Sequence, residues 1–235
     1  MRSPLVWSVV SVLTIGLLSA DAAFAQQQSL NFNLGYFTVR GEDARVDGDA
    51  LVQNRDLYLF DFKDFNSPSI GVDYLVGLGE FLEVGAGIGV TTRGVDTIYD
   101  DFVRPDGSEI QQELKLRIVP MTATVRVLPL GRSAAFQPYV GGGIGIYRWR
   151  YAETGDFVDF TLAGTPIFRD SYVGTGTSFG PVAVFGARVP IGLNASIGGE
   201  VRYQRGEGDL DERDFLGPKI DLGGVHYSAT FGLRW

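Results

Sequence analysis

From about residue 29 onward, apolar residues occupy every second position in segments of about ten residues. This period of two is typical of β-strands that have one apolar face. Between Leu82 and Val90, for example, alternate positions are apolar, and the positions between them hold Glu83 and three glycines. Segments of this kind begin near residues 30, 70, 82, 114, 139, 179, 195 and 225. The pattern therefore predicts eight strands, with ten as the alternative count.

Two of the eight segments are irregular. In the fourth, the apolar positions change phase by one residue at Pro120, which predicts a β-bulge beside that proline. In the sixth, from Phe179 to Val189, an inward-facing Arg188 would place Phe185 and Val189 on the outer face.

The connections between the segments alternate in length. Three are short and rich in turn residues, near 77–80, 129–135 and 190–194. The others are long polar stretches, near 40–67, 92–110, 150–177 and 206–222. This parity predicts an all-β fold, a transmembrane antiparallel up-and-down β-barrel of eight strands with both termini on the periplasmic side. A soluble β-sandwich, the alternative, has no reason to sort its connections by length.

Composition adds a reason for the glycines. The chain of 235 residues holds 32 glycines, nearly twice the usual share of about 7%. An eight-stranded barrel has an interior only just wide enough for its side chains, so inward glycines leave room for larger neighbours.

A formal net charge of −8 gives no basic surface for nucleic acid. With no cysteine, no disulfide holds the fold.

The first 25 residues have the pattern of a secretory signal peptide. Arg2 precedes an apolar stretch from Leu5 to Leu18, and Ala23-Phe24-Ala25 is an A-x-A cleavage site. An uncleaved anchor is the alternative, although the apolar run is shorter than the roughly 20 residues of a spanning helix. The predicted organisation is a signal peptide over residues 1–25 and one barrel domain over residues 26–235.

The end of the chain carries a resemblance to a known family. The segment from Tyr227 to Trp235 alternates apolar positions and ends in an aromatic residue, as the C-terminal signal of outer-membrane barrels does. With the glycine-rich segment 138–145 and the segment 199–203, it resembles the small outer-membrane β-barrel proteins of OmpA, OmpX and OmpW type. The resemblance implies an integral outer-membrane protein, inserted by the barrel-assembly machinery and in contact with outer-membrane lipid and lipopolysaccharide. The expected insertion signal consists of Tyr227, Phe231, Leu233 and Trp235.

The family has no single function, because its members include anchors, adhesins, small-solute channels and a few lipid-modifying enzymes. No peptidoglycan-binding domain follows Trp235, so wall anchorage is not expected.

Five charged residues fall on the inward face of the predicted strands: Asp73, Glu83, Glu200, Arg202 and Arg234. Buried charges must be paired, so these residues predict a salt-bridged network that fills the lumen. The alternative is a polar path for solute, and the narrow interior of eight strands favours the filled lumen.

One motif raises the question of catalysis. His226 and Ser228 lie two residues apart, hence on one face of a strand, and resemble part of the motif of outer-membrane lipid A deacylases. No Asn follows Ser228, no acid follows to orient the imidazole, and the strand phase points both side chains into the lumen. A structural lumen histidine is therefore predicted, with no catalytic residue and no cofactor.

The long connections contain clusters of acidic residues, but none matches a calcium-loop pattern, so no metal site is predicted. The apolar segment 57–65 is unusual for a loop. It is expected either to extend the second strand or to cover the mouth of the barrel.

These observations predict a non-enzymatic integral outer-membrane protein with a structural or surface-interaction role and an unknown surface partner. A narrow channel for small or apolar solutes is the second hypothesis, and a lipid A-modifying enzyme is a remote third.

Overall fold

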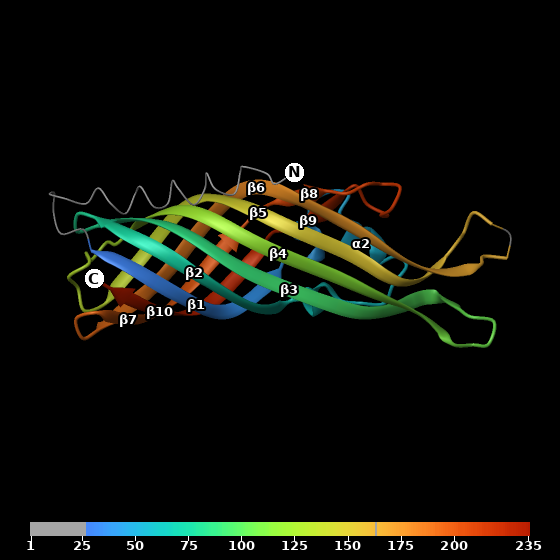
Figure 1. The fold of residues 1–235 in the computed structure, drawn as a ribbon, viewed down its shortest axis with the longest axis horizontal. Helices are drawn as coiled ribbons and strands as arrows, with labels where there is room; N and C mark the ends of the chain where they lie inside the picture. Colours follow the sequence, from blue (N-terminus) through green and yellow to red (C-terminus); the bar gives the residue numbers. More distant parts are fainter. Residues whose placement is uncertain (1–26, 163) are drawn as a thin grey trace, which may run out of the picture.

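Eight antiparallel strands close into a barrel in the computed structural model, which describes residues 27–162 and 164–235 (Figure 1). The predicted signal peptide lies outside the described residues. The strands are β1 (Gln28–Val39), β2 (Ser67–Leu78), β3 (Leu82–Val103), β4 (Glu109–Val127), β5 (Gln137–Val158), β6 (Ile167–Ile191), β7 (Ala195–Gln204) and β10 (Gly224–Arg234). Each pairs with its neighbours in the chain, and β1 pairs with β10 to close the ring. The prediction of an eight-stranded up-and-down barrel is confirmed.

One end of the barrel has short turns and the other has long connections. The turns 79–81, 128–136 and 192–194 lie at the same end as Trp235 (Figure 1). At the opposite end, β3, β4, β5 and β6 continue well past the other four strands (Figure 1). The polar stretches near 92–110 and 150–177 are therefore mostly paired strands, joined by the short loops 104–108 and 159–166.

The part of the barrel that all eight strands share has an apolar exterior. We call this part the stem; its residues are 28–38, 68–78, 82–91, 119–127, 137–147, 178–191, 195–204 and 224–234. Its exposed side chains are largely apolar, and they include Phe32, Leu34, Tyr36, Ile70, Ile88, Val125, Val140, Ile144, Phe179, Phe185, Val189, Ile197, Tyr203, Tyr227, Phe231 and Leu233. Arg188 faces inward and Phe185 and Val189 outward, as predicted. Such a belt on a closed sheet, with every strand paired, is what lipid requires of a spanning protein.

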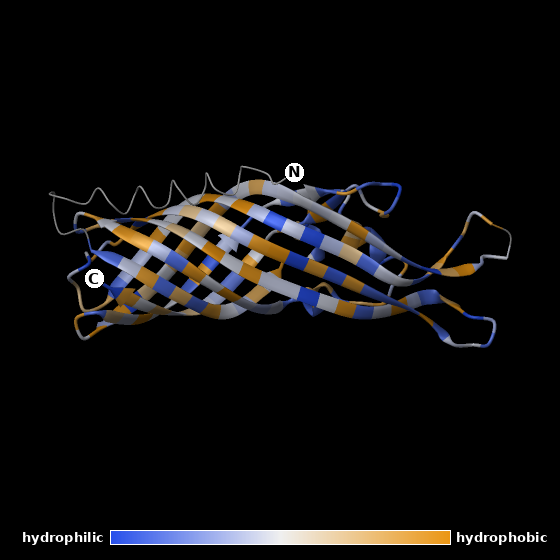
Figure 2. Cartoon of the chain, viewed as in Figure 1, coloured by the Kyte–Doolittle hydropathy of each residue, from blue (hydrophilic) through white to orange (hydrophobic). Residues whose placement is uncertain are grey.

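Beyond the stem, the same strands reverse their polarity. We call residues 92–118 and 148–177, which form this continuation of β3–β6, the extension. On β4, inward Leu114, Leu116 and Ile118 are buried in the extension, whereas inward Thr122 and Thr124 lie in the stem. Figure 2 shows the alternation of hydrophilic and hydrophobic residues along these strands. The outward face is apolar and faces lipid in the stem, and it is polar and faces water in the extension. The inward face is polar in the stem and apolar in the extension.

The predicted bulge at Pro120 is wrong. The register of β4 with β5 is continuous through this proline, and even-numbered residues face inward along the whole strand. The apparent phase change arises because the solvent outside the barrel changes there from water to lipid. The β3–β4 register shifts instead between Ile98 and Val103, in the extension.

The two longest connections fold onto the inner face of the extension. The first holds three short helices, η1 (Glu42–Ala44), α2 (Ala50–Asn54) and η2 (Phe62–Phe65), and the last holds the hairpin β8 (Glu207–Asp209) and β9 (Lys219–Asp221). Among residues 27–162 and 164–235, no helix has the length and apolar character needed to span a membrane.

Candidate functional site

The lumen of the stem contains a neutral cluster of two arginines and two carboxylates. The Arg202 guanidinium lies 2.6 Å from Asp73 Oδ2 and 2.7 Å from Glu200 Oε1. Arg126 Nη2 contacts the same two side chains at 3.2 and 3.1 Å. Asn33 donates a hydrogen bond of 2.9 Å to Asp73. Because each charge has two opposite partners in this buried space, the cluster offsets much of its own desolvation cost.

A second layer lies closer to the short-turn end. Arg188 forms a bidentate ion pair with Glu83 and donates a hydrogen bond of 2.9 Å to Gln137 Oε1. Arg234 donates to the same amide oxygen at 2.8 Å. The Tyr139 ring lies against both layers, with Arg126 at 5.1 Å and Arg188 at 5.9 Å from its centroid, and its hydroxyl donates to Glu200. The two layers form one continuous polar network.

The structure brings the predicted lumen residues into these two layers. Asp73, Glu200 and Arg202 meet in the first layer, whereas Glu83 and Arg234 belong to the second. Arg234 contacts an amide and is in no ion pair with a described carboxylate, which differs from the expectation that each charge is paired.

Sequence reasoning missed Arg126 and Tyr139. Arg126 lies on the face of β4 that holds Thr122 and Thr124, and Tyr139 lies on the glycine face of β5. Strand phase was the signal that could have identified both.

The network leaves little free space in the lumen. The cavity bounded by Asn33, Ser69, Glu200, Arg202 and His226 has a volume of about 40 Å³, enough for a few waters at most. Glycines make the dense packing possible: a Cβ atom at Gly87 would collide with the Asp73 carboxylate, and one at Gly186 with the Tyr139 hydroxyl. The side chains of the two layers therefore pack closely across the stem.

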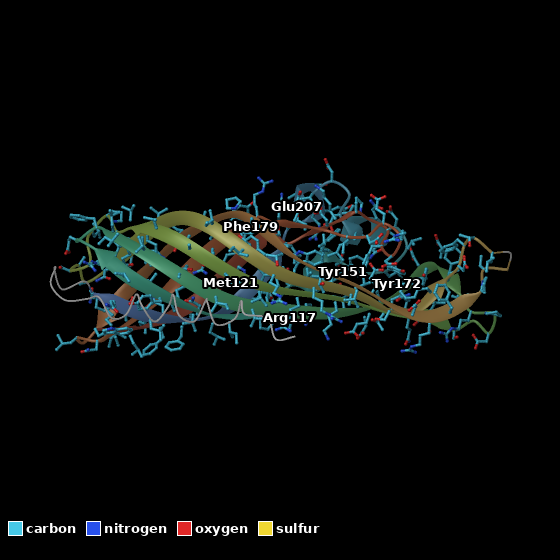
Figure 3. All side chains as sticks on the ribbon, turned by 45° about the horizontal axis from the view of Figure 1, so that its top comes forward. Arg117, Met121, Tyr151, Tyr172, Phe179 and Glu207 are labelled. Atoms are coloured by element: carbon cyan, nitrogen blue, oxygen red, sulfur yellow. The ribbon has the colours of Figure 1, made fainter. Side chains whose placement is uncertain are left out.

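The mouth above the stem is filled by apolar side chains. Phe37 of β1, inward residues of β3–β6 and residues of the first and last connections pack into one core. Its members include Phe37, Leu51, Tyr58, Phe62, Phe65, Val95, Tyr99, Leu114, Leu116, Tyr147, Trp149, Tyr151, Leu210, Phe215 and Ile220. Tyr151 is labelled among the side chains of the extension in Figure 3. The segment 57–65 therefore covers the mouth and does not extend β2, which begins at Ser67.

A buried carboxylate fixes the first connection to the wall. Glu153 Oε1 accepts hydrogen bonds from Asn54 Nδ2 at 2.6 Å and from the Tyr151 hydroxyl at 2.8 Å. Glu153 is 3% exposed and forms no ion pair with a described residue. Burial raises the pKa of Glu153, because the charged form is poorly solvated, although the two hydrogen bonds oppose this shift.

Asp221 joins the first connection to the last. Its carboxylate accepts from Arg40 at 2.9 Å and from the backbone amides of Val46 at 3.0 Å and Gly223 at 2.6 Å. Nearby, Arg45 pairs with Asp49, whose Oδ1 caps α2 by accepting from Leu51 N at 3.1 Å. The two connections therefore form a single cap over the barrel.

His226 and Ser228 do not hydrogen-bond to each other. His226 Nε2 lies 3.2 Å from Gln204 Oε1, and its ring packs on Phe37 with the centroids 4.5 Å apart. The Ser228 hydroxyl donates to the Glu200 carbonyl oxygen at 3.4 Å. Both side chains face the lumen, and each bonds to a different group. Among the described residues, no group of three or more acidic or histidine side chains is arranged to hold a metal ion.

Apolar side chains gather at the far tips of the extension. The Phe102 and Phe160 rings contact each other with centroids 5.0 Å apart, and the Phe157 and Tyr172 rings do so at 4.9 Å. Figure 3 labels Tyr172 on this part of β6. Exposed fractions reach 63% for Val103, 49% for Phe160 and 57% for Leu162. This is an apolar surface on the part of the molecule that lies outside the lipid belt.

No known protein-family profile matches the chain, and no curated protein is similar to it in sequence. Its structure is similar to that of the outer membrane protein OprG from Pseudomonas aeruginosa, with a TM-score of 0.54 and 13% identity over 90% of this chain and 96% of OprG. A major outer membrane protein from Thermus thermophilus gives a TM-score of 0.48 and 12% identity, over 90% of this chain and all of that one. Ail, the attachment invasion locus protein of Yersinia pestis, gives 0.45 and 11%, over 90% of this chain and 100% of Ail.

The closed ring of eight antiparallel strands, its apolar exterior and the likeness to OprG agree with one another. The chain has the fold of the small eight-stranded integral β-barrels of the outer membrane.

Proposed function

We propose that this protein is a non-enzymatic, non-conducting barrel of the outer membrane that presents its extension as an interaction surface outside the cell. The polar network of the stem and the capped mouth support the absence of conduction, because a solute would have to displace both the charged network and an apolar core. A channel would need a continuous polar path, whereas the cavity beside Arg202, of about 40 Å³, has room for only a few waters.

The tips of the extension support the second part. Solvent-exposed aromatic and aliphatic side chains that cluster outside the membrane belt are typical of surfaces that bind another macromolecule. Large apolar residues such as Phe160 and Leu162 are the kind that contribute most to binding once they are covered.

The test for conduction is a planar bilayer measurement on the purified, refolded barrel. We expect no discrete conductance steps. Steps that persist in a highly purified sample, and that change when Arg126 or Arg202 is replaced, would support the channel hypothesis in place of this proposal.

The test for surface interaction uses point substitutions, because deleting the first connection would also remove the cap. Cells that display F160S/L162S should adhere less than wild-type cells to a panel of immobilised matrix proteins, epithelial cells and cells of the same strain. The control is L193S, since Leu193 is 95% exposed in the turn at the opposite end. Equal adhesion of both variants and the wild type, at equal surface amounts, would remove the interaction role and leave the fold unaffected.

A further inference from the structure

Three arginines lie together on the outer wall where the stem meets the extension. Arg117 on β4 and Arg148 and Arg150 on β5 all point outward and are exposed. With Thr175 and Thr177 of β6, they line a surface depression of about 630 Å³. The depression therefore contains three cations and two hydroxyl groups that can donate hydrogen bonds.

No described carboxylate forms an ion pair with any of these three arginines. Arg117 and Arg150 are direct register partners on adjacent strands, so their Cβ atoms lie roughly 4.5–5.5 Å apart. Like charges in this arrangement repel each other. Lys115, two residues from Arg117 along β4, is paired with Glu113 and does not add a free charge. An anion bound between the guanidinium groups would relieve this repulsion.

The depression lies at the upper edge of the lipid belt. Val119 lies two positions from Arg117 toward the stem. Ile146 lies two positions from Arg148 in the same direction, and its register partner on β6 is Phe179. Phe179 is 71% exposed. Figure 3 shows Arg117 on the extension side of both Met121 and Phe179. A molecule that put an anionic group among the arginines would therefore have apolar wall directly below it.

We infer that Arg117, Arg148 and Arg150 bind the phosphate groups of a phosphorylated glycolipid in the outer leaflet, with its acyl chains lying along the stem. Arginine is suited to this role because its planar guanidinium group donates two parallel hydrogen bonds to a phosphate. The location selects a lipid over a free anion, since the interface holds both the charge and the apolar chains of such a molecule. This inference rests on the membrane placement in the proposed function.

The experiment measures lipid retention on the refolded barrel by native mass spectrometry. The probes are bisphosphorylated lipid A and its fully dephosphorylated form, each titrated in the same detergent. We expect wild-type protein to retain the bisphosphorylated form and R117Q/R148Q/R150Q to bind it at least about tenfold more weakly, because several charge-assisted hydrogen bonds are lost. The matched control is R55Q/R169Q/R213Q, which removes the same charge from exposed positions elsewhere.

Equal retention by wild type and the site variant would overturn the assignment, and so would equal retention of the two lipids by wild type. Inorganic phosphate that binds the wild type and displaces the lipid at similar concentrations would indicate an anion site without lipid preference, which also overturns it. A boiling-dependent gel shift verifies that each variant is folded. The variant leaves the tips of the extension and the lumen unchanged, so failure here is distinguishable from failure in the adhesion or conductance tests.

Discussion

Arg126 illustrates at the scale of a single residue why the lumen is charged. It is 1% exposed and its guanidinium contacts both Asp73 and Glu200. In the stem, the outward side chains face lipid and are apolar. The polar side chains therefore point into the lumen, where they form hydrogen bonds and ion pairs with one another. Paired arginines and carboxylates fill this narrow space with large side chains that hold the strands together.

Removing Arg126 should therefore destabilise the barrel. In R126Q, two buried carboxylates share only Arg202, and we expect the free energy of unfolding to fall by about 3–5 kcal/mol. Urea unfolding of the protein refolded into lipid vesicles, followed by tryptophan fluorescence, measures this change. R213Q, whose guanidinium is exposed and pairs with exposed Asp211, is the control and should behave as wild type. An R126Q midpoint equal to that of the control would contradict the structural role of the network.

The environment of Glu153 predicts that the stability of the cap depends on pH. Its pKa is raised in the folded protein by burial, so the folded form holds this proton more tightly than the unfolded form does. Its contribution to stability is therefore complete below the unfolded pKa and is lost as the pH rises through the folded pKa. The pKa of buried Asp49 is raised as well, again chiefly by burial, and acts in the same direction.

We expect protection of the α2 amides from hydrogen exchange, corrected for the intrinsic pH effect, to decrease as the pH rises above about 4.5. E153Q keeps an oxygen that accepts from Asn54 and Tyr151 but carries no charge. The protection of α2 in this variant should therefore depend less on pH, with only the contribution of Asp49 remaining. E42Q, on the exposed side of the first connection, should retain the wild-type slope. The same slope in E153Q as in the wild type would show that Glu153 does not control the cap.

At the scale of a single element, β10 closes the barrel and also ends the chain described here. It pairs with β1 over eleven residue pairs from Ser29–Arg234 to Val39–Gly224, and Tyr227, Phe231, Leu233 and Trp235 all point outward. Trp235 exchanges backbone hydrogen bonds of 3.0 and 3.1 Å with Gln28. These outward side chains do not contribute to the lumen. Their use as an insertion signal stays a prediction.

The substitution F231S/W235S should reduce the outer-membrane recovery of the protein several-fold and abolish the heat-dependent gel shift, while export continues. The comparison is I197S/V201S on neighbouring β7, which also removes two exposed apolar side chains from the lipid face. Fractionated membranes and semi-native gels give both readings. Equal losses in the two variants would mean that lipid contact matters in general and that the terminus carries no separate signal.

At the scale of the whole molecule, the two ends of the barrel differ in a way that predicts its orientation. The long-connection end carries the cap and the extension, and the other end carries three turns. Outer-membrane barrels place short turns in the periplasm and long connections outside.

Cysteines at Asp47, Asp101, Thr161 and Asp211, all exposed at the long-connection end, should react with an impermeant maleimide on intact cells. Cysteines at Leu78 and Leu193 should react only after permeabilisation. Thr161 is preferred to Gly155 as a site, because a side chain at Gly155 would collide with the backbone of Gln111. Labelling in the reverse order would overturn the orientation, and with it the proposal that the extension lies outside the cell.

The sequence by itself determined the strands, their number and the sense of each face in the stem, because alternation of side chains is local and lipid imposes one rule on every strand. It also placed Asp73, Glu200 and Arg202 inward by phase alone. Only the tertiary structure decided what those side chains touch, since Arg126, Asp73 and Glu200 come from three strands whose relative register no local pattern encodes.

The sequence indicated that Glu113 and Arg117 lie above the membrane in an extended hairpin, but it did not indicate how far β3–β6 continue as paired strands. A strand that passes from lipid into water exchanges the polarity of its two faces, so the pattern at Pro120 mimics a bulge in a strand that is regular. The apolar side chains of segment 57–65 could be recognised as unusual, but their burial depends on a wall built by β3–β6. The environment of each face is a property of the assembled barrel in its membrane, and local sequence does not contain it.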